Sequence, residues 1–183
     1  MATTRRRTPT AVVVAALAVG AVAFVAAALT SYLAIDAAYV TVHVVGVSMS
    51  PTLNPGDYAL ARKTHGGPFS RGDIVVIRDP YDPRKDFIKR VVALPGERLQ
   101  IASSVVSING SRLNEPYLNP EPWKVNNTWP ANGSTYLMPP GSYFVMGDNR
   151  NHSSDSTAYG PVASGMIEAV VFERVWPAPG RVR

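Results

Sequence analysis

The chain has 183 residues, with 18 Lys and Arg against 13 Asp and Glu, a formal net charge of +5 and no cysteine. The missing cysteine excludes disulfides, thiolate catalysis and a cysteine-ligated metal. The excess positive charge gathers near the ends, in Arg5-Arg6-Arg7 and Arg181-Val182-Arg183. No basic stripe is interleaved with stacking aromatics, so the charge indicates membrane topology and not nucleic-acid binding.

An uncharged apolar run extends from Ala11 to Leu29. At about 1.5 Å per residue it is long enough to cross about 30 Å of hydrocarbon. We predict a transmembrane signal anchor over residues 11–31, after a cytoplasmic basic N-terminus at residues 1–10. Residues 32–183 then form an extracytoplasmic domain of a single-pass protein of the cell membrane. The alternative is a cleavable signal peptide, for which Ala26-Ala27-Ala28 offers a small-residue site.

The remainder is predicted to be mostly β, because Pro and Gly are frequent and helical periodicity is scarce. Runs rich in β-branched and aromatic residues predict strands at residues 39–45, 58–63, 74–77, 86–94, 99–101, 105–108, 141–146 and 167–176. Asn109-Gly110 predicts a tight hairpin. Residues 112–140 are rich in Pro, Asn, Trp and Tyr with weak periodicity, which predicts an excursion from the main sheet within one catalytic domain.

Ser48 lies in a small-residue turn at the end of the first predicted strand. A serine in such a turn is usually structural, so it needs a base before it indicates catalysis. The three histidines, at positions 43, 65 and 152, lack the spacing of metal ligands, and we predict no metal site. A Ser-His-Asp triad stays open, with His152 as base and Asp148 or Asp155 orienting it.

Lys89 interrupts the apolar run of the strand at residues 86–94. Alternation places Phe87, Lys89 and Val91 on one face of the strand, and Ile88, Arg90 and Val92 on the other. One of the two cations must therefore face what the sheet covers. Burial lowers a lysine pKa from about 10.4 toward neutrality, where the free amine can activate a serine. The alternative is an exposed lysine that protects a sheet edge from aggregation.

Four stretches carry a family resemblance, and they occur in the family's order. They are Ser48-Met49-Ser50-Pro51-Thr52-Leu53, Arg71-Gly72-Asp73-Ile74-Val75-Val76, the segment from Asp86 to Glu97, and the segment from Gly147 to Ser156. With them the chain resembles the bacterial type I signal peptidases, which are membrane-anchored Ser-Lys proteases. The resemblance covers residues 42–176 and the anchor, and it implies a signal-peptidase-like β-fold of antiparallel sheets with an N-terminal transmembrane helix.

The resemblance implies a role for each matching residue. Ser48 is the expected nucleophile and Lys89 the expected general base. Ser153 is expected to hydrogen-bond the lysine amine and orient it. Asp155 and Arg150 are expected to brace the loop around it. Asp148 and Asn149 are expected to be mainly structural.

The chain departs from the family pattern at two positions. Some members have a serine where this chain has Gly46, so the oxyanion hole is expected to use backbone N–H groups, chiefly that of Ser48, with Gly46 permitting close approach. Many members have an arginine where this chain has Thr157. A salt bridge from Asp155 is therefore expected to use Arg150 or Arg90.

The implied reaction is removal of N-terminal signal peptides from exported preproteins, without a metal or cofactor. The expected partners are such preproteins and membrane lipid, with no nucleic acid, and the expected state is a monomer. The substrate is expected to pair in extended form with strand edges. Small residues before the cut would enter apolar pockets lined by Val42, Val44, Met49, Leu53, Val76, Phe87 and Ile88.

Two other hypotheses stay open. One is a Ser-Lys processing protease for a particular secreted or pilin-like substrate. The other is a catalytically silent, membrane-tethered β module that binds peptides. The presence of Ser48, Lys89 and Ser153 disfavours this module, because peptide binding does not require a lysine in the strand at residues 86–94.

Overall fold

The structure is a computed structural model, which describes residues 9–64, 66–82, 84–119, 121, 123 and 129–182. The chain divides into two compact units, Met1–Ala38 and Tyr39–Arg183. The predicted basic residues Arg5-Arg6-Arg7 lie outside the described part, as does a portion of the predicted excursion at residues 112–140.

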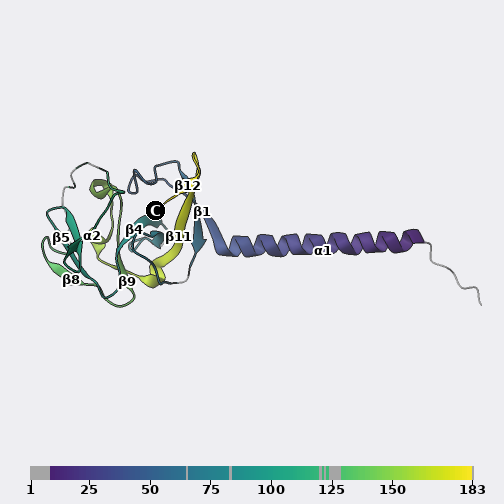
Figure 1. The fold of residues 1–183 in the computed structure, drawn as a ribbon, viewed down its shortest axis with the longest axis horizontal. Coiled ribbons are helices and arrows are strands. Elements are labelled where there is room, and N and C mark those ends of the chain that lie inside the picture. The colour runs from purple at the N-terminus through teal and green to yellow at the C-terminus, as the bar shows by residue number, and fades with distance from the viewer. Residues whose placement is uncertain are drawn as a thin grey trace, which may run out of the picture. The chain divides into compact units, whose positions relative to one another are not determined.

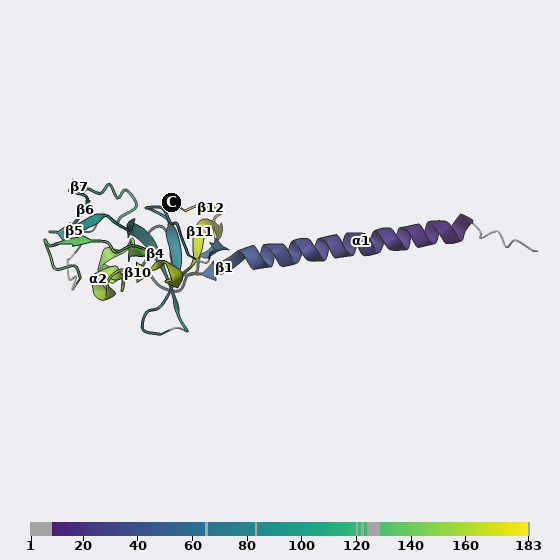
Figure 2. The ribbon, with the colours of Figure 1, turned by 90° about the horizontal axis from the view of Figure 1, so that it is seen from below.

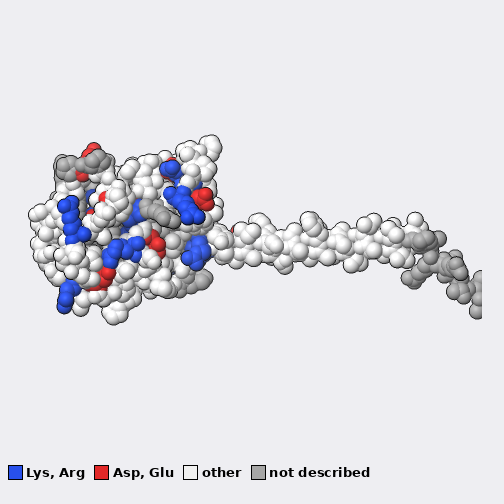
Figure 3. Space-filling model, viewed as in Figure 1, with Lys and Arg blue, Asp and Glu red and all other residues white. Residues whose placement is uncertain are grey.

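The first unit contains the helix α1, Pro9–Ala38. It continues beyond residue 31, where we predicted the anchor to end. Its residues are mostly apolar, with Asp36 as the one charged residue of Pro9–Ala38, and the face seen in Figure 3 is almost free of charged residues. By length and composition, Thr10–Ala38 could cross a membrane.

The second unit, where the structure describes it, is built on an eight-stranded antiparallel sheet with the order β1-β2-β11-β3-β4-β9-β10, and β12 pairs with β11. Its strands are β1 (Tyr39–His43), β2 (Tyr58–Lys63), β3 (Ile74–Arg78), β4 (Asp86–Ala93), β9 (Ser142–Met146), β10 (Val162–Ala163), β11 (Ile167–Trp176) and β12 (Gly180–Arg181). The late strand β11, yellow in Figures 1 and 2, pairs with the early strands β2 and β3 on its two sides. The mostly β, antiparallel fold predicted from the sequence is confirmed.

A four-stranded sheet has the order β7-β6-β5-β8. Its strands are β5 (Arg98–Ala102), β6 (Val105–Ile108), β7 (Ser111–Arg112) and β8 (Thr135–Leu137). Asn109 and Gly110 join β6 to β7 with φ angles of 53° and 83°, as a hairpin turn with two left-handed residues requires. The predicted hairpin is therefore confirmed. The strands β7 and β8 hold the two ends of the predicted excursion in this sheet.

Apolar side chains cover both faces of the main sheet. Successive residues of β3 enter different cores: Ile74 and Val76 pack with Met49 and Leu53, whereas Val75 and Ile77 pack with Val91 and Val145. A third core joins β4 and β9 to the smaller sheet. The short elements η1 (Arg150–His152), α2 (Ser156–Tyr159) and η2 (Ser164–Met166) lie between β9 and β11. In this part of β4 the charged residues Lys89 and Arg90 are buried, at 2% and 1% exposure.

Arg90 on β4 forms a buried ion pair with Asp148, which follows β9. The guanidinium donates to both carboxylate oxygens, at 2.8 Å from Nε and 2.6 Å from Nη2. The hydroxyl of Thr52 donates to the same carboxylate at 2.5 Å, and the ring of Tyr117 lies 4.0 Å from the guanidinium. This pair ties the turn after Ser48, strand β4 and the loop after β9 to one another.

The variant Asp148→Ala is expected to lower the free energy of unfolding by about 3–5 kcal/mol, because it leaves Arg90 charged and buried without its partner. Urea unfolding of the full chain in detergent micelles measures this change. Asp82→Ala is the matched control, since Asp82 pairs with the exposed side chains of Arg84 and Lys85. If the two variants lose equal stability, the ion pair does not have this structural role.

Candidate active site

Ser48 begins a tight turn that is anchored in the core by buried side chains. Met49 and Leu53 are 1% and 0% exposed, and the N–H of Leu53 donates to the carbonyl of Met49 at 2.9 Å. Val44, at the entry to the turn, exchanges backbone hydrogen bonds with Gly56 and Asp57. The hydroxyl of Ser48 is thus presented by a turn whose two ends are fixed.

Lys89 reaches this hydroxyl from the middle of the sheet. It lies opposite Val75 in the β3–β4 register and is 2% exposed. Its Nζ donates to Ser48 Oγ at 2.9 Å and to the Ile88 carbonyl oxygen at 3.0 Å. The Nζ also lies 5.1 Å from the centre of the Phe87 ring, in agreement with the prediction that Phe87 and Lys89 share a face.

Burial lowers the pKa of the Lys89 amine from 10.5 to about 8. The cause is desolvation, which penalises the ammonium form. The carboxylates of Asp155 and Asp148 oppose the shift, but neither is in contact with the amine. A substantial fraction of Lys89 is therefore uncharged at weakly alkaline pH and can accept a proton.

Ser153 does not make the hydrogen bond to Lys89 that we expected. Its Oγ is buried and has no hydrogen-bond partner among the described residues. The hydrogen bonds of the lysine amine go to Ser48 and to the carbonyl of Ile88 instead. The Ser153 hydroxyl lies beside Gly147, and a Cβ built on that glycine would be 2.3 Å from it.

Asp155 is held by neutral donors. Its carboxylate accepts hydrogen bonds from the N–H of Gly147 at 2.9 Å, the N–H of Thr157 at 3.0 Å and the hydroxyl of Thr157 at 2.7 Å. It also caps the N-terminus of α2. The expected salt bridge to Arg150 or Arg90 is wrong. Thr157, which stands where many relatives have arginine, supplies hydrogen bonds in its place.

Arg150 pairs with Glu115 and not with Asp155. Both side chains are buried, at 5% and 9% exposure, and Arg150 also lies over the ring of Trp123. The Nε of Arg150 donates to the carbonyl of Gly147 at 3.1 Å. Glu115 was not predicted from the sequence, because its contact with Arg150 joins distant segments of the chain.

The loop after β9 also holds the turn that carries Ser48. The N–H of Asn149 donates to the carbonyl of Ser48 at 3.0 Å, and its side-chain amide donates to the carbonyl of Val47 at 3.2 Å. Asp148 and Asn149 therefore make structural contacts, as expected. Through them the loop fixes the backbone on both sides of the Ser48 hydroxyl.

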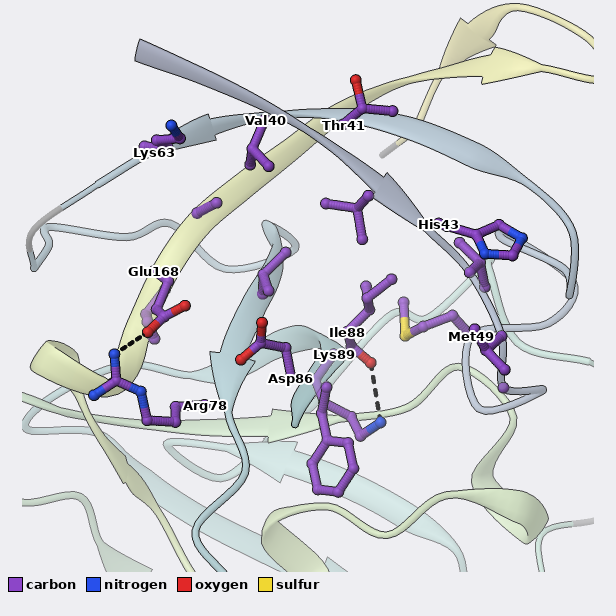
Figure 4. Close-up of a pocket in the computed structure, with 18 of the residues that line it drawn as sticks. Val40, Thr41, His43, Met49, Lys63, Arg78, Asp86, Ile88, Lys89 and Glu168 are labelled. Carbon is purple, nitrogen blue, oxygen red and sulfur yellow. Dashed lines mark hydrogen bonds and ion pairs between the residues drawn. The ribbon is translucent and has the colours of Figure 1, made fainter. Parts of the chain in front are cut away.

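Ser48 and Lys89 line a pocket of about 850 Å³ (Figure 4). Of the expected substrate-binding residues, six line it: Val42, Val44, Met49, Val76, Phe87 and Ile88. Leu53 does not, because it is fully buried in the core beneath the turn. Gly46 also lines the pocket, and a Cβ added there would meet nothing within 4 Å.

The histidine hypothesis finds little support in this geometry. His152 is an exposed residue of η1 and does not line the pocket. His43 lines the pocket, with its ring stacked on Tyr58 at 4.6 Å. His65 lies outside the described residues. The side chain in contact with the Ser48 hydroxyl is Lys89.

Residues 15–176 match the family described as signal peptidase, peptidase S26. The chain belongs to this family. It is 36% identical over 144 residues to a signal peptidase I of Bacillus caldolyticus, a match that covers 73% of this chain and 78% of the relative. It is 40% identical over 118 residues to a signal peptidase I of Bacillus licheniformis, covering 62% and 63%. The resemblance recognised in the sequence motifs is thereby confirmed, and the chain is a peptidase.

Among solved structures, a crystal structure of a signal peptidase I from Enterococcus faecalis V583 shares 30% sequence identity with this chain. The match covers 57% of this chain and 97% of that one, with a TM-score of 0.47.

The variant Gly147→Ala is expected to lower peptidase activity by at least about a hundredfold, the scale on which small misplacements of reacting groups act. Its Cβ would lie 2.3 Å from Ser153 Oγ and 2.4 Å from the carbonyl oxygen of Ser48, so one of them must move. Initial rates on a signal-peptide substrate measure the loss. Gly180→Ala is the control, because a Cβ there meets nothing within 4 Å. Full activity of Gly147→Ala would show that this close contact does not position the nucleophile.

Proposed function

We propose that the protein is a membrane-anchored signal peptidase I that removes signal peptides with Ser48 as nucleophile and Lys89 as general base. The single observation that carries this proposal is the 2.9 Å contact between Lys89 Nζ and Ser48 Oγ, made by a lysine that is 2% exposed. A serine nucleophile needs an adjacent base, and a desolvated lysine can provide one.

In the proposed reaction, Ser48 Oγ attacks the carbonyl carbon of the scissile peptide bond while neutral Lys89 takes the hydroxyl proton. The tetrahedral intermediate collapses to an ester on Ser48. The ammonium of Lys89 gives its proton to the departing amine. A water molecule then attacks the ester with Lys89 again as base, which releases the acyl product and restores the hydroxyl.

The proposed oxyanion hole uses the backbone N–H of Ser48. Among the described residues, none accepts a hydrogen bond from this N–H. Gly46 lies two residues before it with open space around its Cα. A carbonyl oxygen can therefore approach the N–H without displacing a side chain.

An extended substrate has a strand edge to pair with beside Lys89. The described pairing of β4 with β9 starts at Arg90, so Asp86–Lys89 have β3 on one side and no strand on the other. The apolar residues that line the pocket between Lys89 and β1 can accommodate small substrate side chains before the cleaved bond. Such pairing along a free edge supports recognition through the substrate backbone.

The helix α1 supports membrane anchoring, with the basic N-terminus in the cytoplasm and the peptidase domain outside. A protease and a substrate tethered to the same membrane meet at high effective concentration. This gives the anchor a function in cleaving membrane-bound preproteins.

The variants Ser48→Ala and Lys89→Ala are each expected to lower preprotein cleavage by at least about a thousandfold, because neither half of the pair works alone. A gel assay with a preprotein carrying an Ala-x-Ala site, and mass-spectrometric mapping of the cut, measure this. His152→Ala is the control and is expected to keep most activity. Loss of activity in His152→Ala, with retention in Lys89→Ala, would favour the histidine triad.

The pH dependence of cleavage should follow the amine of Lys89. Because only the uncharged amine accepts a proton, kcat/KM is expected to rise about tenfold per pH unit below its pKa and to level off above it. The lowered pKa places this change near pH 8. Rates on a soluble peptide, with circular dichroism recorded at each pH as a control for folding, test this. A rate that is flat across this range would exclude Lys89 as the base.

A further inference from the structure

The pocket that holds Ser48 and Lys89 continues into a charged end. This end is lined by Lys63 on β2, Arg78 on β3, Asp86 on β4 and Glu168 on β11. Figure 4 shows Arg78, Asp86 and Glu168 together, on the side of the pocket away from Met49 and His43. Asp86 precedes Lys89 by three residues on one strand, so the two positions lie about 10 Å apart.

Within the part of the chain that the structure describes, the carboxylate of Asp86 contacts no side chain of opposite charge. Asp86 is opposite Arg78 in the β3–β4 register, but the guanidinium of Arg78 donates to Glu168. Among the described residues, none donates a hydrogen bond to the Asp86 side chain or forms an ion pair with it. Burial and the nearby charge of Glu168 raise the pKa of Asp86, while Arg78 acts against them.

We propose that Asp86, supported by Glu168, forms a subsite for a lysine or arginine side chain of the substrate, at the fourth or fifth residue before the cleaved bond. This inference rests on the signal peptidase function proposed above. It adds a charge preference upstream of the small residues that fill the apolar part of the pocket.

The position follows from strand geometry. An extended substrate that runs along β4 advances about as far per residue as β4 itself. With its cleaved bond at Ser48, the residues that lie beside Asp86 are those about three positions further back. The flexible stem of a lysine or arginine can cross the remaining gap while its methylene groups lie against apolar surface.

The sign of the preference follows from what each charge already contacts. Arg78 is engaged by Glu168, so it is not available to attract an acidic substrate residue. Lys63 belongs to β2, across the pocket from Asp86 (Figure 4). An acidic side chain beside Asp86 would be repelled by its carboxylate, whereas a cation there gains a carboxylate partner.

The test compares peptides that are identical except for Lys, Gln or Glu at the fourth or at the fifth residue before an Ala-x-Ala cleavage site. With the full chain in detergent micelles, kcat/KM for the Lys peptide is expected to exceed that for Gln by about three- to tenfold, with Glu below Gln. High salt, at about 0.5 M, should reduce the preference. The variant Asp86→Asn is expected to remove it.

Three further variants separate this subsite from a general effect of charge. The variant Asp82→Asn should keep the preference for the Lys peptide. It removes a carboxylate from the segment between β3 and β4, and Asp82 does not line the pocket. Arg78→Gln should increase the preference, because the cation that opposes Asp86 is gone. Glu168→Gln should reduce it, because Arg78 is then released to pair with Asp86.

Equal cleavage of the Lys and Gln peptides, or a preference that survives in Asp86→Asn, would overturn the subsite. Binding to the Ser48→Ala protein, measured by fluorescence anisotropy, tests the subsite apart from catalysis and should show the same order of peptides. Efficient cleavage of every peptide without a charge preference would retain the proposed function and reject the subsite. Tighter binding of the Lys peptide without any cleavage would do the reverse.

Discussion

Burial of a lysine amine inside a sheet that is covered on both faces is the constraint on which the site depends. Lys89 and Arg90 are adjacent and almost equally buried, yet their surroundings differ. Arg90 meets both oxygens of Asp148, and a guanidinium keeps its proton in proteins. Among the described residues, the amine of Lys89 donates hydrogen bonds to a hydroxyl and a carbonyl oxygen and contacts no carboxylate. Arg90 therefore has a structural role, whereas the surroundings of Lys89 allow its amine to exchange a proton.

The loop after β9 fixes the position of Ser48 relative to Lys89. Gly147 lies against both the Ser48 carbonyl and the Ser153 hydroxyl, at distances that exclude a Cβ. Its own N–H is bound by Asp155, and its carbonyl by Arg150, which Glu115 fixes in turn. The position of Ser48 thus depends on a chain of buried polar contacts that extends to Glu115, in the segment between β7 and β8.

Local patterns in the sequence predicted most of the strands, and β2, β6 and β11 have the predicted bounds. Alternation placed Lys89 and Arg90 on opposite faces, but it could not show that both faces are covered. The covering of both faces depends on the pairing of β11 with β2 and β3 and on contacts between distant segments. For the same reason charge alone misassigned the partner of Asp155. Its carboxylate is satisfied by N–H and hydroxyl donors at a helix N-terminus, a solution that charge complementarity does not reveal.

Strand β4 carries the features of the site in a fixed order. Asp86 lies at the charged end of the pocket, Ile88 lines its apolar part, and Lys89 contacts the hydroxyl of Ser48. The irregularity in the pairing of β4 with β9 comes only between Val91 and Ala93, so Asp86–Lys89 pair with β3 in a regular register. A slip of one residue would turn every side chain to the other face. If Asp86 and Lys89 have the roles proposed above, one strand presents both the subsite and the general base, and the contacts that select a substrate along it also place its peptide bond at Ser48.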